Sequence, residues 1–369
     1  MEVVKFADIV SRVNTKEDRF NTDKIYYVGG DHIDSNELMV RQRGIIKGST
    51  IGPMFYCGFK AGDILFVTRN PHLRKCAVVD FDGICSEKTF VLATKDSSKL
   101  LQEYLALIMQ SDEFWAYCDE NKSGGVNFFL NWSTLADYEF SLPSIEEQKV
   151  LADKLWAAYK VKESYRQLLS TTDEMLKAKF QEMFGKEPTM TLGKLAESWS
   201  KGQAFKKDEI VDGGKTPCIH YGQLYQYGAV IENILSFTDA DAVRTSKIGD
   251  ILFPASDVTP KGLARCSCIN KDGVILGGDI IIMHPLEGLN SAYLSYAINQ
   301  QTQQLLALVT GSVVRHMSAK SLQTVRIPVP EKEDQQQFAE IATQAEATKA
   351  SLRASIEAID RVIRSLINQ

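Results

Sequence analysis

The sequence has 369 residues, of which 44% are hydrophobic and 24% are charged, and its net charge is −5 at pH 7. This composition excludes a disordered chain, and the length allows two or three domains whose cores need no metal or disulfide. No stretch approaches the ~18 uncharged apolar residues of a membrane span. The start, Met1-Glu2-Val3-Val4-Lys5, lacks the basic and then apolar pattern of a secretion signal. We therefore expect a cytoplasmic protein.

The cysteines do not indicate a disulfide framework or a zinc site. They are an odd number without CxxC spacing, at positions 57, 76, 85, 118, 218, 266 and 268. We interpret Cys266 and Cys268 as residues packed on one strand. No metal site is predicted.

Charge is distributed unevenly in the first half of the chain. Residues 41–79 contain seven basic side chains against one acidic, Asp63, whereas residues 103–139 contain seven acidic side chains against one basic, Lys122. The net negative charge argues against a nucleic-acid partner, because phosphate neutralisation favours basic surfaces. The local basic stretch is compatible with DNA contact, and also with two solvated faces of opposite charge.

An internal repeat organises the chain. The segment Gly62-Asp63-Ile64-Leu65-Phe66 recurs as Gly249-Asp250-Ile251-Leu252-Phe253, so the repeat offset is 249 − 62 = 187. The same offset relates Gly124 to Gly311, Val126 to Val313, Leu135 to Leu322, Pro143 to Pro330 and Gln148 to Gln335. Between these positions the register drifts by two or three positions, as Tyr104 against Tyr293 shows, and then returns. Two copies of one module are therefore predicted.

Each copy is predicted to begin with an α+β globule, over residues 1–143 and 188–330. Short apolar runs such as 64–67 and 280–283, separated by glycine, proline, asparagine and aspartate, indicate strands. One helical pattern interrupts the strands in each copy, at 98–118 and at 290–309. Each globule ends at a proline, Pro143 or Pro330, after which the periodicity becomes helical.

A long helix follows each globule, over residues 144–187 and 331–369. Ser144 and Glu147 have the spacing of a capping box, whereas Glu331 and Asp334 form a weaker cap. Apolar residues then recur at alternating spacings of three and four, which are coiled-coil core positions. These positions are Leu151, Leu155, Ala158, Lys162, Tyr165, Leu169, Thr172, Leu176 and Phe180, and, at the repeat offset, Phe338, Ala342, Ala345, Lys349, Leu352, Ile356, Ile359, Ile363 and Ile367. About 36 residues give a rod of roughly 50 Å, and Gly185 and Pro188 are predicted to end the first rod.

We predict that the two helices pair as an antiparallel coiled coil with a pseudo-twofold axis, which places the globules at opposite ends. A parallel pairing, with the globules side by side, is the alternative. Lys162 and Lys349 occupy equivalent core positions. They could fix the register by penalising slipped arrangements, or they could extend their ammonium groups into solvent.

Two similar but non-identical globules on a rigid spacer suit a linear ligand with two separated, non-identical sites. Duplex DNA is such a ligand, and dimeric proteins contact half-sites on it about 34 Å apart. We therefore expect each globule to read base edges while basic side chains hold phosphates.

Several segments follow one another in a fixed order, and most of them occur in both copies. They are Tyr26-Tyr27-Val28-Gly29-Gly30-Asp31-His32-Ile33, the two Gly-Asp-Ile-Leu-Phe segments, the turns at Gly124 and Gly311, Leu142-Pro143-Ser144-Ile145-Glu146-Glu147-Gln148, and Ile327-Pro328-Val329-Pro330 leading to Gln335. With these segments the whole sequence resembles the specificity subunits of type I restriction-modification systems. In the second copy, Glu331-Lys332-Glu333-Asp334 departs from the Ser-Ile-Glu-Glu pattern, which affects only the helix cap.

The resemblance implies a non-catalytic protein. Each globule would be a target-recognition domain for one half of a bipartite DNA sequence. The helices would form the spacer that docks methyltransferase subunits, and we expect two such subunits. This chain would bind no cofactor itself. S-adenosylmethionine would belong to the methyltransferase subunits, and ATP and Mg to a restriction subunit that can join the complex.

Candidate DNA contacts lie mainly after the two Gly-Asp-Ile-Leu-Phe strands. The first copy supplies Thr68, Arg69, Asn70, His72, Arg74 and Lys75, and the second supplies Ser256, Lys261 and Arg265. Arginine can bind guanine, and asparagine adenine, through paired hydrogen bonds. Further candidates are Arg41, Arg43 and Lys47 for phosphates, Tyr221 and Gln223 for polar or stacking contacts, and Arg315 and His316, which occupy the place of Phe128 and Phe129. A solvated loop or ordinary packing is the alternative at each place.

Enzymatic functions find little support. A DNA amino-methyltransferase would need an Asn/Asp-Pro-Pro-aromatic site, but Asn70-Pro71-His72-Leu73 has a single proline and lacks the aromatic residue. Walker A, dinucleotide-binding and nuclease carboxylate patterns are not evident. The alternatives are an enzyme with an unrecognised site and a scaffold that holds two proteins rather than DNA.

Overall fold

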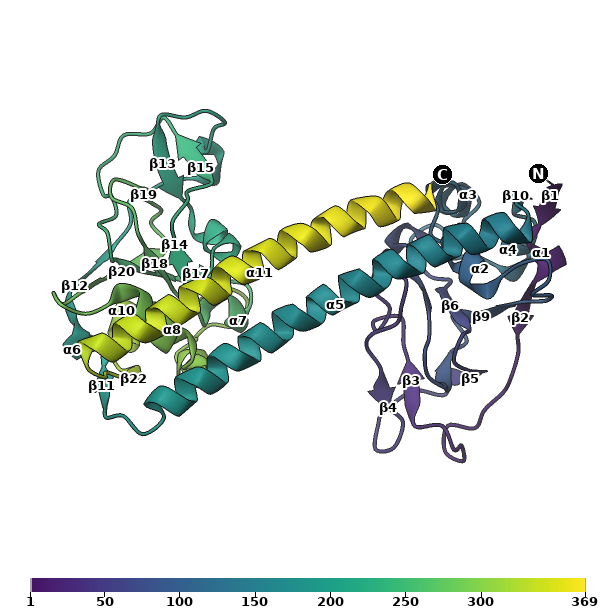
Figure 1. Cartoon of the computed structure of the whole chain (residues 1–369), viewed down its shortest axis with the longest axis horizontal. Helices are drawn as coiled ribbons and strands as arrows, with labels where there is room; N and C mark the ends of the chain where they lie inside the picture. The colour runs from purple at the N-terminus through teal and green to yellow at the C-terminus, as the bar shows by residue number, and fades with distance from the viewer. Residues whose placement is uncertain (1, 369) are drawn as a thin grey trace. The chain divides into compact units, whose positions relative to one another are not determined.

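The computed structural model describes residues 2–368, which form two compact units. The first unit contains the residues up to Arg166 and those from Ala354 onward, and the second is Gln167–Arg353. Two long helices, α5 (Ile145–Phe184) and α11 (Lys332–Ile367), contribute to both units. Each unit therefore combines one globule with the start of its own long helix and the end of the other one (Figure 1).

The first globule contains three sheets, ordered β1-β10, β2-β9-β6-β7 and β4-β3-β8-β5. Its strands are β1 (Glu2–Lys5), β2 (Val10–Val13), β3 (Tyr26–Val28), β4 (Gly44–Ile45), β5 (Phe55–Phe59), β6 (Ile64–Val67), β7 (Cys76–Val78), β8 (Gly83–Ser86), β9 (Thr89–Thr94) and β10 (Glu139–Leu142). Its short helices are α1 (Phe6–Ile9), the 3-10 turn η1 (Pro71–Leu73), α2 (Gln102–Ile108), α3 (Asp112–Glu120) and α4 (Trp132–Ala136).

The second globule repeats this plan with sheets β11-β22, β12-β20-β16-β18-β14, β15-β13-β19 and β17-β21. Its strands are β11 (Thr189–Thr191), β12 (Ala196–Lys201), β13 (Thr216–Ile219), β14 (Val230–Ile231), β15 (Ser236–Thr238), β16 (Ile251–Pro254), β17 (Ser256–Asp257), β18 (Ser267–Ile269), β19 (Ile275–Leu276), β20 (Ile280–Pro285), β21 (Arg315–His316) and β22 (Arg326–Pro328). Its short helices are α6 (Leu192–Leu195), the 3-10 turns η2 (Lys207–Glu209) and η3 (Tyr221–Gln226), α7 (Pro260–Leu263), α8 (Ser291–Asn299), α9 (Thr302–Ala307) and α10 (Ala319–Leu322). The predicted α+β class is confirmed.

The repeated Gly-Asp-Ile-Leu-Phe segment forms the same turn and central strand in both units. The glycines, Gly62 and Gly249, have φ of 93° and 90°, which favours a residue without a side chain. Asp63 Oδ2 accepts a hydrogen bond from the backbone N–H of Lys60, and Asp250 Oδ2 accepts the equivalent bond from Lys247, both at 2.8 Å. The apolar residues that follow are buried in β6 and β16. The repeat is thus retained because it closes a turn and fills the core.

The single helix predicted within each globule is wrong, because two short helices stand in its place. In the first unit the break between α2 and α3 carries Gln110, whose amide donates to the backbone carbonyls of Glu37 and Cys76. In the second unit Asn299, at the end of α8, exchanges two hydrogen bonds with the backbone of Cys266. An amide side chain that binds a neighbouring strand therefore accompanies each break.

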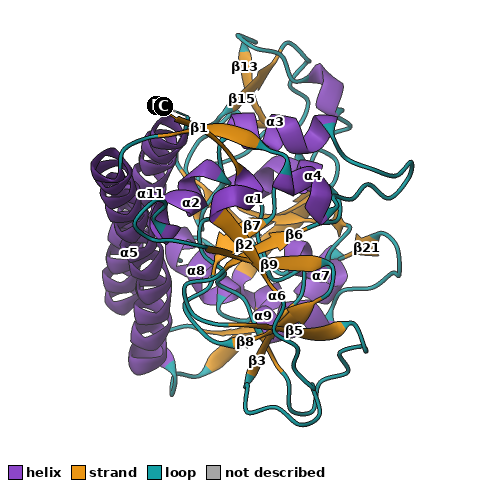
Figure 2. Ribbon diagram, turned by 90° about the vertical axis from the view of Figure 1, so that its right-hand side faces the viewer, coloured by secondary structure: helices purple, strands orange, loops and turns teal. Residues whose placement is uncertain are grey.

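The helices α5 and α11 lie side by side and run antiparallel in each unit (Figures 1 and 2). In the first unit Lys162 pairs with Asp360, while the earlier residue Leu151 packs in the same cluster as the later residue Ile367. In the second unit Lys349 pairs with Asp173, while the rings of Phe180 and Phe338 lie 5.3 Å apart. All of the predicted stripe positions are buried or half-buried. The Ser144–Glu147 capping box also forms at the start of α5.

The two core lysines do not extend into solvent, so that interpretation is wrong. The Lys162 side chain is 6% exposed, and its Nζ lies 2.7 Å from Asp360 Oδ1 and 3.1 Å from Glu37 Oε1. The Lys349 side chain is 8% exposed, and its Nζ lies 2.6 Å from Asp173 Oδ1. A buried ammonium needs such partners, because its desolvation is otherwise uncompensated.

A buried glutamine fixes each globule to the start of its helix. Gln148 accepts a hydrogen bond from the backbone N–H of Leu101 and donates to the carbonyls of Lys99 and Pro143. Gln335 likewise accepts from Asn290 and donates to Pro330. This contact explains why the Pro-to-Gln spacing is the same in both copies.

Glu37 joins the first globule to the helix layer. Burial alone would raise its pKa, but hydrogen bonds from Arg166 and the charges of Lys162, Arg166 and Arg41 outweigh burial and lower the pKa to about 2. The ordinary value is 4.5. Because the folded protein holds the carboxylate ionised, this contact stabilises the fold above pH 4.5 and loses its effect as the pH falls toward 2.

We predict that Glu37→Gln lowers the free energy of unfolding by about 3 kcal/mol near pH 7, since it removes the carboxylate that Lys162 and Arg166 share and leaves them only Asp360 and Glu163. Urea unfolding at several pH values measures this loss, which should shrink below pH 4.5. Glu357→Gln, at an exposed position of α11, is the matched control and should leave stability unchanged. Equal stability of Glu37→Gln and wild type at pH 7 would contradict this account.

Candidate nucleic-acid interface

In the first unit the segment after β6 lies against a hairpin formed by residues 123–129. The hairpin is closed by two hydrogen bonds between Ser123 and Phe129, each 2.9 Å long. It is joined to the strand segment by bonds from Leu130 N to Thr68 O and from Asn70 N to Phe128 O, both 2.9 Å. Arg69 and Phe129 are bridge partners. Two loops far apart in sequence thus form one surface.

The second unit builds the same surface from equivalent residues. Thr310 and His316 close the hairpin of residues 310–316 with bonds of 3.1 and 2.8 Å, and Met317 N donates to Ala255 O at 2.9 Å. Ser256 pairs with His316 across β17 and β21. Each of these positions is the first unit's position shifted by the repeat offset. The backbone frame is therefore shared, while Arg69 and Phe129 in one unit are replaced by Ser256 and His316 in the other.

The predicted cluster after β6 divides into outward and inward side chains. Arg69 and His72 are exposed, and Asn70 is half-buried. The Arg69 guanidinium lies 5.2 Å from the centre of the Phe129 ring. These three residues are the ones that the surface leaves available for a ligand.

Thr68, Arg74 and Lys75 are occupied by contacts within the protein. Thr68 is buried, and its hydroxyl donates to the Lys88 carbonyl at 2.8 Å. The Arg74 guanidinium forms an ion pair with Asp112 at 2.6 Å, and the Lys75 ammonium donates to the Gly30 carbonyl at 2.5 Å. Thr68 in particular does not reach the surface, because its hydroxyl completes the strand-end hydrogen bonding.

The three basic candidates at positions 41–47 belong to a different part of the first unit. Arg41 pairs with Asp34 at 3.4 Å and with Glu37 at 3.7 Å. Arg43 precedes β4, and its guanidinium lies over the rings of Tyr26 and Phe81 at 4.1 and 4.5 Å. Lys47 is exposed.

In the second unit Ser256 and His316 are joined directly, since Ser256 Oγ and His316 Nδ1 are 3.0 Å apart. Arg315 donates to the Gly311 carbonyl at 2.6 Å and so braces the hairpin. Lys261 is exposed on α7. Ser256, His316 and Lys261 therefore present the polar groups of this surface.

Tyr221, Gln223 and Arg265 are held by contacts within the second unit. Gln223 accepts from the backbone N–H of His220 and also bonds Ser236, and the Tyr221 ring packs 4.5 Å from His220. Arg265 is half-buried, and its guanidinium donates to the Tyr225 and Tyr227 carbonyls.

Residues missed by the sequence analysis complete the surface. In the first unit the Lys122 ammonium lies 4.9 Å from the centre of the Phe128 ring. In the second unit Asp257 accepts hydrogen bonds from Tyr225 and from Thr259. Burial alone would raise the pKa of Asp257, but these hydrogen bonds outweigh it and lower the pKa. The available signals were the position of Asp257 directly after Ser256 and that of Lys122 just before the repeated glycine turn.

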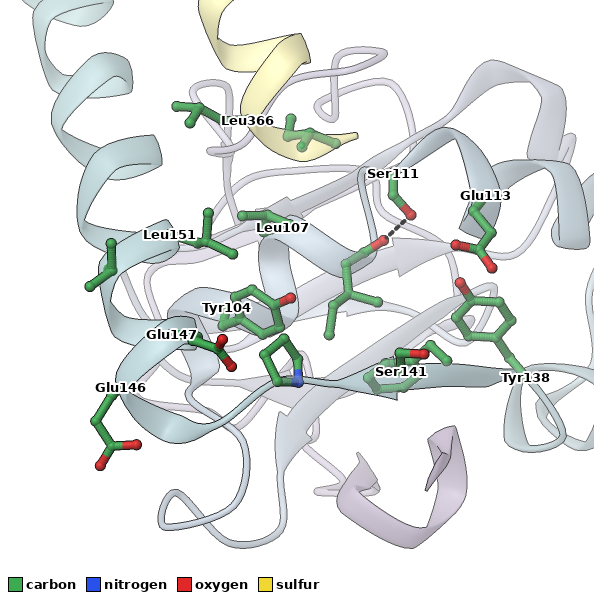
Figure 3. Close-up of a pocket in the computed structure, with 15 residues that line it drawn as sticks. Tyr104, Leu107, Ser111, Glu113, Tyr138, Ser141, Glu146, Glu147, Leu151 and Leu366 are labelled. Carbon is green, nitrogen blue, oxygen red and sulfur yellow. Dashed lines mark hydrogen bonds between the residues drawn. The ribbon is translucent and has the colours of Figure 1, made fainter. Parts of the chain in front are cut away.

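An apolar groove of about 680 Å³ in the first unit is a poor nucleic-acid site (Figure 3). Apolar residues such as Leu107, Leu151 and Leu366 line it together with Glu113 and Glu147. These carboxylates would repel phosphate groups. The groove therefore does not belong to the candidate interface.

Three hydrogen-bonded side chains in the second unit, Ser200, His284 and Asp250, have the connectivity of a hydrolase triad. Ser200 Oγ lies 2.9 Å from His284 Nε2, and His284 Nδ1 lies 2.6 Å from Asp250 Oδ1. Asp250 also accepts from Lys247, as Asp63 does from Lys60 in the first unit, so its carboxylate serves the turn before β16. We interpret these three hydrogen-bonded side chains as structural. They lie at the opposite end of β16 from the hairpin.

Comparison with known families identifies the kind of module that is duplicated. The model of the type I restriction modification DNA specificity domain matches residues 1–169 and 186–361. The chain belongs to this family. The resemblance noted in the sequence is thereby confirmed, and the two matched ranges correspond to the two copies of the repeat.

Solved structures of this family share the fold. The chain is 13% identical to the S subunit of a type I restriction-modification system from M. genitalium, with a TM-score of 0.60 over 99% of this chain and 94% of that one. A structure from work on the assembly and conformational transition of a type I R-M system is 18% identical, with a TM-score of 0.54 over 99% and 96% of the two chains. No curated protein matches the sequence.

Neither a metal-ligating cluster nor a membrane-spanning helix is present among residues 2–368. Within residues 2–368, no group of three or more His, Cys, Asp or Glu side chains could hold a metal ion. Of the helices that the structure describes, none is long and apolar enough to cross a membrane. Cys266 and Cys268 are buried, with Cys268 on β18 and Cys266 directly before it.

We predict that Arg69→Ala weakens binding to the target DNA roughly 10- to 100-fold by losing a base contact, and that His316→Ala acts on the other half of the target. Titration of the target DNA with complexes that contain each variant would measure the loss of affinity, and sequencing of the sites that they methylate would show which half of the target is affected. Arg74→Ala is the comparison, and its effect should be smaller because Asp112 already holds that guanidinium. Unaltered methylation sites for both Arg69→Ala and His316→Ala would contradict this assignment.

Proposed function

We propose that this chain is the non-catalytic specificity subunit of a type I restriction-modification complex, in which each unit reads one half of a bipartite DNA target. The observation that carries the proposal is the pair of equivalent hairpin surfaces. Arg69 beside Phe129 offers a guanidinium and an aromatic ring, whereas Ser256 beside His316 offers a hydroxyl and an imidazole. Different donors and acceptors on one backbone frame suit two half-sites of different sequence.

The net charge of −5 belongs to the whole chain and does not describe the candidate surface, which exposes basic side chains in the first unit. In the first unit Arg69 and His72 are exposed, while Lys122, directly before the hairpin, lies against the Phe128 ring and pairs with Asp119 at 3.0 Å. Phosphate contacts position a protein on duplex DNA, while base contacts give it specificity. Exposed Lys47 and Lys261 are our candidates for the phosphate contacts.

We further propose that the long helices dock methyltransferase subunits. In the first unit α5 leaves Val150 and Val161 exposed, and in the second unit it leaves Leu168 and Met175 exposed. Apolar side chains on a surface helix suit packing against another protein. In such a complex S-adenosylmethionine would be bound by the methyltransferase subunits, and ATP and Mg by a restriction subunit, while this chain supplies sequence recognition.

Methyl transfer by purified components tests this function. We predict that the chain alone, with S-adenosylmethionine and DNA, transfers no methyl groups, and that adding its methyltransferase partner produces methylation at one bipartite sequence. The partner without this chain is the control and should not methylate that sequence. Methyl transfer by the chain alone would refute the non-catalytic role.

A further inference from the structure

Each hairpin presents an exposed valine near its tip. Val126 is 93% exposed and Val313 is 81% exposed, and they are separated by the repeat offset. Single exposed apolar residues are common on protein surfaces. Here the valine recurs at the same place while residues on both sides of it differ between the two loops. Packing within the protein does not account for the recurrence of valine at this position, because neither side chain is buried.

The hairpins hold these valines in a defined position. Each valine lies inside a short loop closed by reciprocal backbone hydrogen bonds, between Ser123 and Phe129 or between Thr310 and His316. Gly124 and Gly311 turn the chain with φ of 98° and 93°. A Cβ atom added to Gly124 would lie 2.5 Å from the Asn127 carbonyl oxygen, which shows how tight the turn is.

The base of each hairpin is joined to the segment that carries the polar candidates. Leu130 N donates to Thr68 O in the first unit, and Met317 N donates to Ala255 O in the second. Arg69 and Ser256 directly follow the two accepting residues. The exposed valine and the polar side chains therefore belong to the same small, cross-linked surface in each unit.

We propose that Val126 and Val313 are specificity residues that contact thymine methyl groups, one in each half-site. The inference rests on the proposed DNA-reading function and adds an apolar contact to it. The C5-methyl group of thymine is the apolar feature of the major groove, and small apolar side chains recognise it there. Arg69 and His316 would read neighbouring hydrogen-bonding groups, so that each surface combines a polar and an apolar contact.

The experiment uses the full complex with its methyltransferase partner and the target found for the wild type. Val126→Ser and Val313→Ser should each lower target affinity about tenfold, the effect of losing the contact of one valine that is exposed in the free protein and would be buried against the bound DNA. Replacing a contacted thymine with deoxyuridine should weaken wild-type binding by a similar factor. The same DNA change should have no further effect on the variant that has already lost the contact.

The controls are exposed valines away from the hairpins. Val3→Ser, on β1, and Val243→Ser, in the segment before β16, replace side chains that are 63% and 77% exposed. Both should bind the target as wild type does. Thermal unfolding of all four variants should match the wild type, because none of the replaced side chains is buried.

The possible failures are distinguishable. If the wild-type complex shows no sequence-specific methylation, the proposed function fails and this inference falls with it. If the wild type is specific but Val126→Ser and Val313→Ser bind as tightly as the controls, only the valine proposal is overturned. It is also overturned if every thymine-to-deoxyuridine replacement changes the affinity of the wild type and of both valine variants equally. Loss of affinity for the methyltransferase instead of for DNA would overturn it as well.

Discussion

The buried ion pairs between α5 and α11 are the constraint on which the helix layer depends. Lys162 pairs with Asp360 and Lys349 with Asp173. The repeat offset relates Lys162 to Lys349 and Asp173 to Asp360, so the two pairs are equivalent. The lysine lies on α5 in the first pair and on α11 in the second. In a pair of antiparallel helices, the residue numbers of two facing residues add up to the same total all along the pair. The two ion pairs have the same total, so a single register of the helices forms both of them. A parallel pairing in equivalent register would instead place Lys162 beside Lys349, two like charges in a dry environment.

The two globules also share their internal structure: the turns and the central strands recur, whereas the side chains on the hairpin surfaces differ. Gln148 and Gln335 fix the helix starts, and Asp63 and Asp250 close the same turn. Because these contacts lie inside the units, the hairpin surfaces can change without loss of the fold. This separation of frame and surface would allow the two units to read different half-sites, as we propose.

The repeat, the long helices and the place of the hairpins could be predicted from the sequence, because periodicity and a fixed offset are local patterns. The partners of Lys162 could have been found in part, since an aspartate follows each core lysine at the same spacing, Asp173 and Asp360. Glu37 could not, because it lies in the first globule, outside the helical repeat, and no spacing relates it to Lys162. The inward orientation of Thr68 and the breaks between α2 and α3 and between α8 and α9 also depend on tertiary hydrogen bonds, which residue spacing in the sequence does not reveal.

If the two units of this chain read two different half-sites, each methylated site must contain two different sequence elements. Sequencing of methylated DNA from cells that express this chain with its methyltransferase partner tests it most directly. We expect one motif made of two short, different sequences separated by a fixed number of unspecified bases. A single continuous motif, or methylation without a sequence preference, would contradict it.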